Sequence, residues 1–151
     1  MQAHEFMKKE VIKVKETDSV RSVIEKFIEY SISGLPAIND ANKIVAYISD
    51  GDIMRYIGKH KDIHIETFYY VDCIKGDDDE YHDRVKRILD LNVKEIAKKS
   101  VQTIAWDAEI EDIAAILGKK RIKKLPVERN GVLVGIISRG DVIRHSFKTF
   151  L

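Results

Sequence analysis

The stretch LPAINDANKIVAYISDGDIMR, residues 35–55, returns in similar form as LPVERNGVLVGIISRGDVIR, residues 125–144. Aligning Pro36 with Pro126 gives an offset of 126 − 36 = 90 residues, and apolar positions continue to coincide toward the N-terminus. One residue is lost in the turn, so that Asp52 pairs with Asp141 at 141 − 52 = 89. Turns tolerate such a deletion because it leaves the flanking elements intact. The chain is therefore an internal repeat of roughly 50 residues.

Each copy predicts the same order of secondary structure. A short strand over residues 11–15 or 101–105 is followed by Thr17 or Asp107, either of which can cap the next helix. That helix has an apolar stripe, and two strands joined by a turn rich in Asn, Asp or Gly follow it. The stripes are Val20, Val23, Ile24, Phe27 and Ile28, and Ile110, Ile113, Ala114 and Leu117. A second helix begins after Ser49 or Ser138, so each copy is an α/β (α+β) unit of order β-α-β-β-α.

Composition excludes several classes of protein. The chain has 151 residues, 44% of them hydrophobic, which is enough for a sizeable core. Lys and Arg total 26 against 25 acidic residues, so no global field attracts nucleic acid or anionic lipid. The single Cys73 excludes an internal disulfide framework and fits a reducing compartment. With no apolar stretch of membrane-spanning length and no apolar leader core, we expect a cytoplasmic protein that contacts neither membrane nor nucleic acid.

The repeated ending resembles the CBS domain, which is named after cystathionine β-synthase and occurs in tandem as the Bateman module. The resemblance rests on GLPAIN and IVAYISDGD in the first copy, and on KLPVER and LVGIISRGD in the second. It implies a stand-alone pair of repeats packed about a pseudo-twofold axis, at residues 1–57 and 95–151, with an inserted connector over 58–94 that holds a helix and an acidic turn. Proteins of this family bind AMP, ADP, ATP or S-adenosylmethionine in clefts between the repeats and usually regulate something else.

Two interpretations of the Ser-x-x-Asp ending stay open. Ser49 and Ser138 stand where a strand stops and a helix starts, a place where unpaired N–H groups favour a phosphate. Asp52 or Asp141 offers two carboxylate oxygens to the hydroxyls of a ribose, so the motif suits a nucleotide. The same spacing is also a variant of the capping box, in which the Ser and the acid satisfy backbone amides at the helix start. In that case the aspartates only cap helices.

The resemblance also implies which residues form each cleft. Adenine would lie between the first strand and the residues before the Leu-Pro pair of one repeat, while the other repeat supplies the hairpin strand and the Asp. The cleft of Asp141 would combine Val11, Ile12, Ile32 and Ser33 with Ile136, Ser138 and Asp141. The cleft of Asp52 would combine Val101, Gln102, Ile122 and Lys123 with Tyr47, Ser49 and Asp52. For Val11, Ile32, Val101 and Ile122, plain core packing is the alternative.

Charge distinguishes the two clefts. Arg139 follows Ser138, and its guanidinium can grip a phosphate, whereas the equivalent Asp50 would repel one. Lys123 and Lys124 stand where the first copy has Ser33 and Gly34, and they return positive charge to the Asp52 cleft. We expect the Asp141 cleft, with Arg139, to be the stronger site for a phosphorylated ligand.

The connector is too long for a tight linker and too apolar for a flexible one, so we expect it to pack against the module. Residues 68–74 are its apolar part, and an acidic turn follows them. A helix is predicted after that turn, with Val85, Ile88 and Leu89 on one face. We predict no metal site, because the acidic turn lacks the alternating ligands of a calcium loop, and His60 and His64 have no carboxylate at a known motif position.

No arrangement typical of catalysis is found in the sequence, and Cys73 lies in an apolar stretch that favours an inert thiol. We predict that the protein is not an enzyme, requires no cofactor, and senses an adenine nucleotide as a regulatory ligand. The alternative is a structural dimerisation module without a small-molecule ligand. Either function predicts a homodimer through the second helices of the repeats, and sensing also predicts a protein partner that the sequence does not identify.

Overall fold

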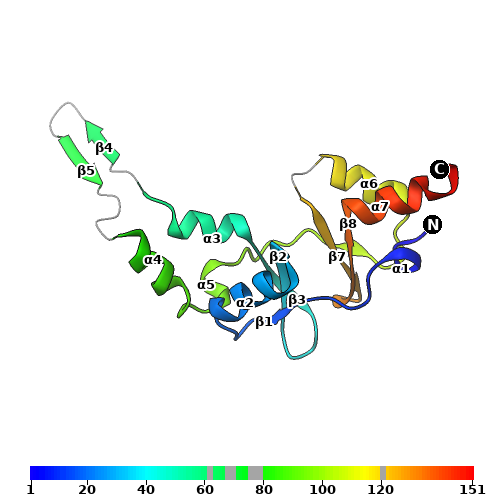
Figure 1. Cartoon of the computed structure of the whole chain (residues 1–151), viewed down its shortest axis with the longest axis horizontal. Coiled ribbons are helices and arrows are strands. Elements are labelled where there is room, and N and C mark those ends of the chain that lie inside the picture. Colours follow the sequence, from blue (N-terminus) through cyan, green and yellow to red (C-terminus); the bar gives the residue numbers. More distant parts are fainter. Residues whose placement is uncertain (61–62, 67–70, 75–79, 120–121) are drawn as a thin grey trace.

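The computed structural model describes residues 1–60, 63–66, 71–74, 80–119 and 122–151. Its two copies form separate three-stranded sheets, of strand order β1-β2-β3 and β6-β7-β8, with helices around them (Figure 1). The elements of the first half are α1 (Ala3–Phe6), β1 (Val14–Lys15), α2 (Val20–Tyr30), β2 (Gly34–Ile38), β3 (Ile44–Ser49) and α3 (Asp50–Ile57). Those of the connector are β4 (Ile63–Glu66), β5 (Val71–Ile74) and α4 (Tyr81–Ile88). The second half holds α5 (Val93–Ile96), β6 (Ile104–Ala105), α6 (Ile110–Lys119), β7 (Lys124–Arg129), β8 (Val132–Ser138), α7 (Arg139–Phe147) and a 3-10 turn, η1 (Lys148–Phe150).

The two sheets have the same topology, which confirms the predicted repeat. In each, the short first strand pairs in parallel with the second, and the second pairs antiparallel with the third. Leu35 faces Ile48 in one sheet and Leu125 faces Ile137 in the other, and all four are fully buried. The register shifts at equivalent places, after Ala37 and after Val127. Only residues 14–15 and 104–105 of the predicted first strands are paired, so these strands are shorter than predicted.

The helix starts differ from the sequence prediction. The carboxylate of Asp18 accepts from the Lys15 amide at 2.9 Å, so the chain makes a turn before α2 begins. Ser19 is the N-cap, and its hydroxyl accepts from the Ser22 amide at 3.4 Å, which corrects the prediction that Thr17 caps this helix. In the second copy α6 begins at Ile110, so Asp107 is not its cap either. The apolar stripe of α2 is also narrower than predicted, because Ile28 is 76% exposed.

Each core contains a short helix that comes from the other half of the chain. Ala3 and Phe6 of α1 are buried in the core of the second sheet, and Val93 of α5 is buried in the core of the first. The segments next to these helices extend onto the opposite sheet: Lys8 exchanges two backbone hydrogen bonds with Ile136, and Lys98 exchanges two with Tyr47. These equivalent pairs relate the copies by the pseudo-twofold axis that the resemblance implies.

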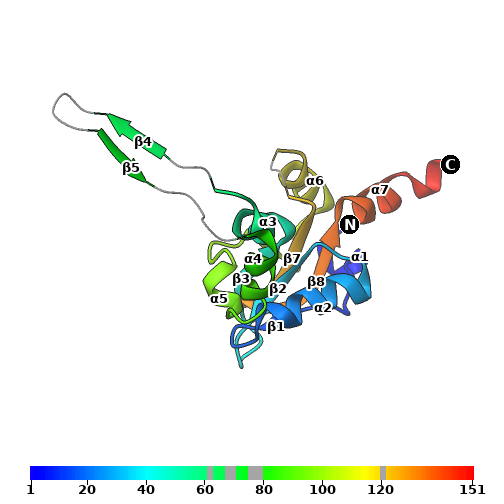
Figure 2. The same ribbon diagram turned by 60° about the vertical axis from the view of Figure 1, so that its left-hand side comes forward.

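The connector contains a β-hairpin that the sequence did not predict. Strands β4 and β5 pair antiparallel and project away from both sheets (Figures 1 and 2). The predicted helix α4 follows, and Ile88 and Val85 pack it against the first core. Phe68, Tyr69, Tyr70 and residues 76–79 of the acidic turn, for which packing against the module was predicted, lie outside the described residues. None of the helices in the described part of the chain is long and apolar enough to cross a membrane.

Candidate functional site

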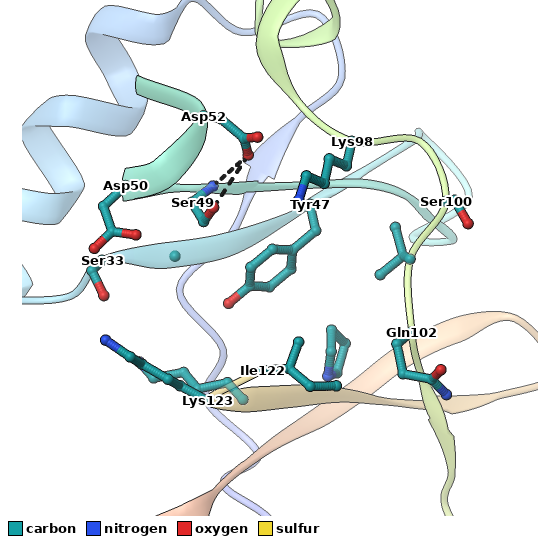
Figure 3. Close-up of a pocket in the computed structure, with 14 residues that line it drawn as sticks. Ser33, Tyr47, Ser49, Asp50, Asp52, Lys98, Ser100, Gln102, Ile122 and Lys123 are labelled. Carbon is teal, nitrogen blue, oxygen red and sulfur yellow. Dashed lines mark hydrogen bonds between the residues drawn. The ribbon is translucent and has the colours of Figure 1, made fainter. Parts of the chain in front are cut away.

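A cleft of about 350 Å³ opens between the two repeats beside the start of α3 (Figure 3). The first repeat contributes Ser33, Gly34, Tyr47, Ser49, Asp50 and Asp52 to its lining. The second copy contributes Lys98, Ser100, Val101, Gln102, Ile122, Lys123, Lys124 and Pro126. Concave sites of this size, with an apolar wall and a few polar groups, are typical of small-molecule binding. Because neither repeat forms this cleft alone, anything bound in it contacts both.

The start of α3 is organised by Ser49 and Asp52. The carboxylate of Asp52 accepts from the Ser49 amide at 2.9 Å and from its hydroxyl at 3.3 Å, so the capping interaction anticipated from the sequence is formed. Its other oxygen pairs with the guanidinium of Arg55, one turn along the helix. The Asp52 side chain is only 3% exposed, whereas that of Arg55 is 62% exposed. The carboxylate is therefore held in the interior, while most of its cationic partner is exposed to solvent.

Tyr47 forms the floor of the cleft on β3. Its backbone is fixed by the pair of 2.9 Å hydrogen bonds with Lys98, so the hairpin of one repeat and the segment 98–102 of the other meet here. Burial, followed by the negative charge of Asp50, raises the pKa of Tyr47 to about 12. Its hydroxyl is therefore protonated and available as a donor over the whole neutral range.

All seven residues predicted for the Asp52 cleft line this one cavity: Val101, Gln102, Ile122, Lys123, Tyr47, Ser49 and Asp52. Ser33, which was predicted for the other cleft, lies here too. The sequence reasoning missed Lys98 and Ser100. The offset of 90 carries a signal for Lys98, because it aligns this residue with Lys8, which also lies against the opposite sheet.

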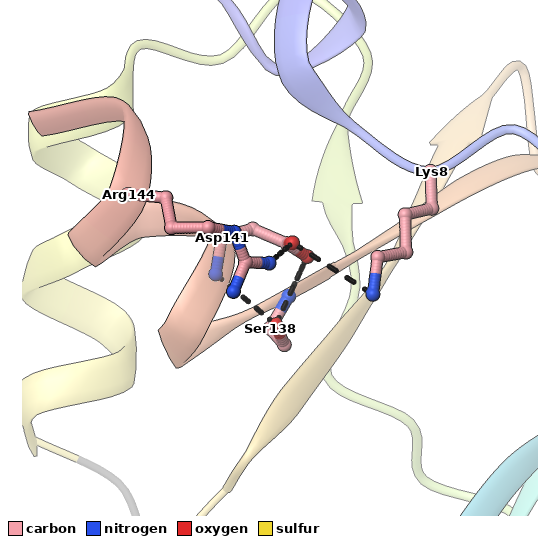
Figure 4. A network of polar contacts seen from close by, with 4 residues as sticks. All are labelled: Lys8, Ser138, Asp141 and Arg144. Atoms are coloured by element: carbon pink, nitrogen blue, oxygen red, sulfur yellow. Dashed lines mark hydrogen bonds and ion pairs between the residues drawn. The ribbon is translucent and has the colours of Figure 1, made fainter. Parts of the chain in front are cut away.

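The equivalent position in the second copy is a compact ion network (Figure 4). Asp141 accepts at 2.9 Å from both the amide and the hydroxyl of Ser138, and it pairs with the Arg144 guanidinium. Lys8 adds a longer ion pair, with its Nζ 3.9 Å from the carboxylate. Burial alone would raise the pKa of Asp141, but the Ser138 hydrogen bonds, Lys8 and Arg144 outweigh it and lower that pKa. Burial and the Lys8 charge lower the pKa of Lys124, partly offset by Asp141.

Arg139 makes a contact within its own repeat. Its guanidinium donates to the Leu117 carbonyl of α6 at 2.9 Å. A guanidinium has five N–H donors, so this one contact does not test the predicted role of Arg139 toward a phosphate, which stays a prediction. Ile12 and Ile32 pack against the first core, in line with the alternative interpretation given above for Ile32, and Val11 is half-buried. Ile136 pairs with the Lys8 backbone, as Tyr47 does with Lys98.

The candidate histidines of the connector are not arranged as a helical pair. His60 follows the end of α3, where its ring lies 2.7 Å from the Arg55 carbonyl, and His64 is on β4. Among the residues that the structure describes, no group of three or more His, Cys, Asp or Glu side chains is placed to hold a metal ion.

Comparison with known proteins identifies the architecture. A family model described as the CBS domain matches residues 3–59 and 93–148. The chain belongs to the CBS-domain family. Among curated proteins it is 31% identical over 147 residues to the uncharacterised protein MJ1426 of Methanocaldococcus jannaschii, covering 92% of this chain and 87% of that one. It is 28% identical over 134 residues to the chloroplastic CBS domain-containing protein CBSX2 of Arabidopsis thaliana, covering 87% of this chain and 56% of that one.

Solved structures share the fold of this CBS-domain pair. CBSX2 in complex with AMP superimposes with a TM-score of 0.73 at 24% identity, covering 99% of this chain and 98% of the other. The CBS-domain pair of protein MJ0100, in complex with 5-methylthioadenosine and S-adenosyl-L-methionine, gives a TM-score of 0.67 at 17% identity, covering 99% and 98%. Residues 60–92, which form most of the connector, lie between the two stretches that match the family model.

Proposed function

We propose that this CBS-domain pair is a regulatory module that binds an adenosine-containing nucleotide in the Asp52 cleft. One observation carries the proposal. Seven side chains implied by the family resemblance come from two distant parts of the sequence and line a single cavity of about 350 Å³. That cavity lies at the start of α3, where backbone N–H groups and the helix dipole favour an anionic group.

Each part of a nucleotide has a partner in this cleft. Adenine packs against the apolar wall of Val101, Ile122 and Pro126. The ribose hydroxyls bind the Asp52 carboxylate, which has two acceptor oxygens. The exposed Arg55 leaves the carboxylate to make room for one of those hydroxyls. The phosphate then lies at the start of α3, toward the lysines of the second repeat.

The ligands of related structures support this assignment. CBSX2 binds AMP, and the MJ0100 pair binds 5-methylthioadenosine and S-adenosyl-L-methionine. These ligands share adenosine and differ in the group at its 5′ position. The Asp141 cleft is the pseudo-equivalent site, and we rank it second because Ser33, one of the residues predicted for it, lines the Asp52 cleft instead.

A thermal-unfolding panel tests the proposal. AMP, ADP, ATP, adenosine and S-adenosylmethionine are compared with GMP as the control for the base. A ligand at 100 times its dissociation constant stabilises the native state by about 2.7 kcal/mol. We expect at least one adenosine ligand to raise the melting temperature at micromolar to millimolar concentration, with GMP less effective. No shift with any adenosine ligand would contradict the proposal.

One observation favours a second candidate function, a structural dimerisation module without a ligand. Both Ser-x-x-Asp endings form a capping box, in which the Ser and the Asp each accept from a backbone amide at the helix start. Under this alternative the aspartates stabilise helices only, and the whole panel leaves the melting temperature unchanged.

We further propose that the chain acts as a homodimer. Three large apolar residues on these helices are exposed. They are Met54 of α3, and Ile143 and Phe147 of α7, and each has between 53% and 58% of its surface exposed. Association through these helices would cover them. Sedimentation is expected to give twice the 17.4 kDa mass of the chain, and a monomer at all micromolar concentrations would contradict this.

The module acts by conformation or association and not by catalysis. Nucleotide binding in a cleft built from both repeats changes how they are held together, and a separate protein partner detects that change. We also propose a cytoplasmic location, because a single cysteine, Cys73, fits a reducing compartment.

A further inference from the structure

Tyr47 and Gly34 form a matched pair in the Asp52 cleft. A Cβ atom on Gly34 would lie 2.6 Å from the Tyr47 hydroxyl and 3.0 Å from the ring carbon Cε1. The ring therefore occupies the space that a side chain at position 34 would take. At the equivalent positions the second copy has Lys124 and Ile136. The first repeat thus has a glycine that makes room for an aromatic ring, and the second does not.

The Tyr47 hydroxyl points into the cleft and away from its own strand (Figure 3). It forms no hydrogen bond with any residue in the described part of the chain, although most of the ring is covered. Its raised pKa of about 12 keeps the proton on the oxygen. A protonated phenol facing an open cavity is a donor that a bound molecule can satisfy.

The surroundings of this hydroxyl identify the kind of acceptor. Lys123 and Lys124 of the second repeat line the same cleft and bring two positive charges to it. Asp50, at the first position of α3, is near enough to Tyr47 for its charge to influence the phenol. Asp50 is partly engaged, because its carboxylate accepts from the Gly51 amide at 2.8 Å. The cleft lining therefore combines one phenol donor and two lysine ammonium groups with the carboxylate of Asp50.

We propose that Tyr47 is a specificity-determining residue, whose hydroxyl donates a hydrogen bond to the phosphate of a nucleoside monophosphate beside Lys123. This inference rests on the proposed function and goes beyond it by naming the group that recognises the 5′ phosphate of the nucleotide. Tyr47, Asp52 and Lys123 line the same cavity, so a nucleotide whose ribose is held by Asp52 can present its phosphate to the Tyr47 hydroxyl. Ile136 has no donor, so the Asp141 cleft lacks this contact.

Calorimetric titration with AMP and adenosine tests this role. The variant Tyr47→Phe keeps the ring over Gly34 and removes only the hydroxyl. We expect AMP to bind about tenfold more weakly to this variant, because a hydrogen bond to a charged acceptor is lost, and adenosine to bind within twofold of wild type. Tyr56→Phe, which removes a phenol hydroxyl on α3 outside the cleft lining, serves as the matched control and leaves both affinities unchanged.

The outcomes separate the inference from the proposed function. Wild-type AMP binding that is unaffected by Tyr47→Phe would overturn the role of the hydroxyl and leave the cleft assignment intact. An equal loss for AMP and adenosine would also overturn it, since the ring and not the hydroxyl would then be responsible. If wild type bound no adenine ligand, both would fall. Melting temperatures of the free variants within a few degrees of wild type would exclude misfolding as the cause.

Discussion

Tyr47 lies so close to Gly34 that its hydroxyl is 2.6 Å from the position of an added Cβ atom. Such a distance is shorter than any normal contact, so Gly34→Ala must displace the ring or the strand. Overpacking of this kind costs about 1–3 kcal/mol of unfolding free energy. We expect that loss in urea unfolding of Gly34→Ala.

A double-mutant cycle identifies the cause of that loss. In a Tyr47→Ala background, the cost of Gly34→Ala should largely disappear, because the ring is gone. Gly118→Ala in α6 is the control, since an added Cβ there meets nothing within 4 Å. Additive effects of the Gly34 and Tyr47 substitutions would show that the two residues do not compete for space.

Asp50 is expected to weaken the binding of anionic ligands. Its carboxylate lines the cleft at the start of α3, on the side where we place the phosphate. Asp50→Asn removes a like charge, so we expect AMP to bind roughly three- to tenfold more tightly and adenosine to bind as before. The gain should shrink in high salt, because screening weakens the repulsion. An equal gain for adenosine would contradict this electrostatic explanation.

Asp141 should make stability depend on pH. Its folded-state pKa lies below the ordinary value of 3.8, so the carboxylate contributes stability above that value and loses it as the pH falls through the folded pKa. We expect Asp141→Asn to be less stable than wild type at pH 7 and the difference to shrink below about pH 4. Urea unfolding at pH 7, 5 and 3 measures it. A difference that is constant over this range would rule out a role for the charge.

Arg84 of α4 links the connector to the end of α3 through a hydrogen bond. The residue is 6% exposed, and its Nε donates to the Ile57 carbonyl at 3.0 Å. Arg84→Leu leaves that carbonyl without this donor, which should lower the unfolding free energy by about 1–3 kcal/mol. Lys86→Leu, at an exposed position of the same helix, is expected to stay within about 0.5 kcal/mol of wild type. Equal effects of the two substitutions would argue against the contact.

The repeat could be predicted from the sequence because its signals are local and occur twice. Strand alternation, the turn and the Ser-x-x-Asp ending all depend on short spacings, and the offset of 90 aligned them across the copies. The seven residues of the Asp52 cleft were predicted from the family resemblance, carried position by position onto this sequence. The family resemblance supplied the pairing of the two copies, which periodicity alone does not.

The direction of individual side chains could not be predicted. Arg139 had two possible partners, a ligand phosphate and a helix carbonyl, and only the packing of α6 places the Leu117 carbonyl at 2.9 Å. Thr17 is not the N-cap of α2, because Lys15 and Asp18 form a turn before the helix begins. Strands β4 and β5 each have four residues, which is too short for their apolar residues to show a period that distinguishes strand from helix.

The central claim is that the Asp52 cleft binds an adenine nucleotide through its ribose, and calorimetry with AMP on wild type and Asp52→Asn tests it most directly. Asn keeps the size of the side chain and can still cap the helix, but it loses the charged acceptor. Asp112→Asn is the matched control, because it makes the same change at an exposed carboxylate in the first turn of α6, outside the cleft lining. We predict AMP affinity to fall roughly 10- to 100-fold in Asp52→Asn, as expected for loss of a hydrogen bond to a charged group, and to be unchanged in Asp112→Asn. The same AMP affinity in wild type and Asp52→Asn would contradict the account.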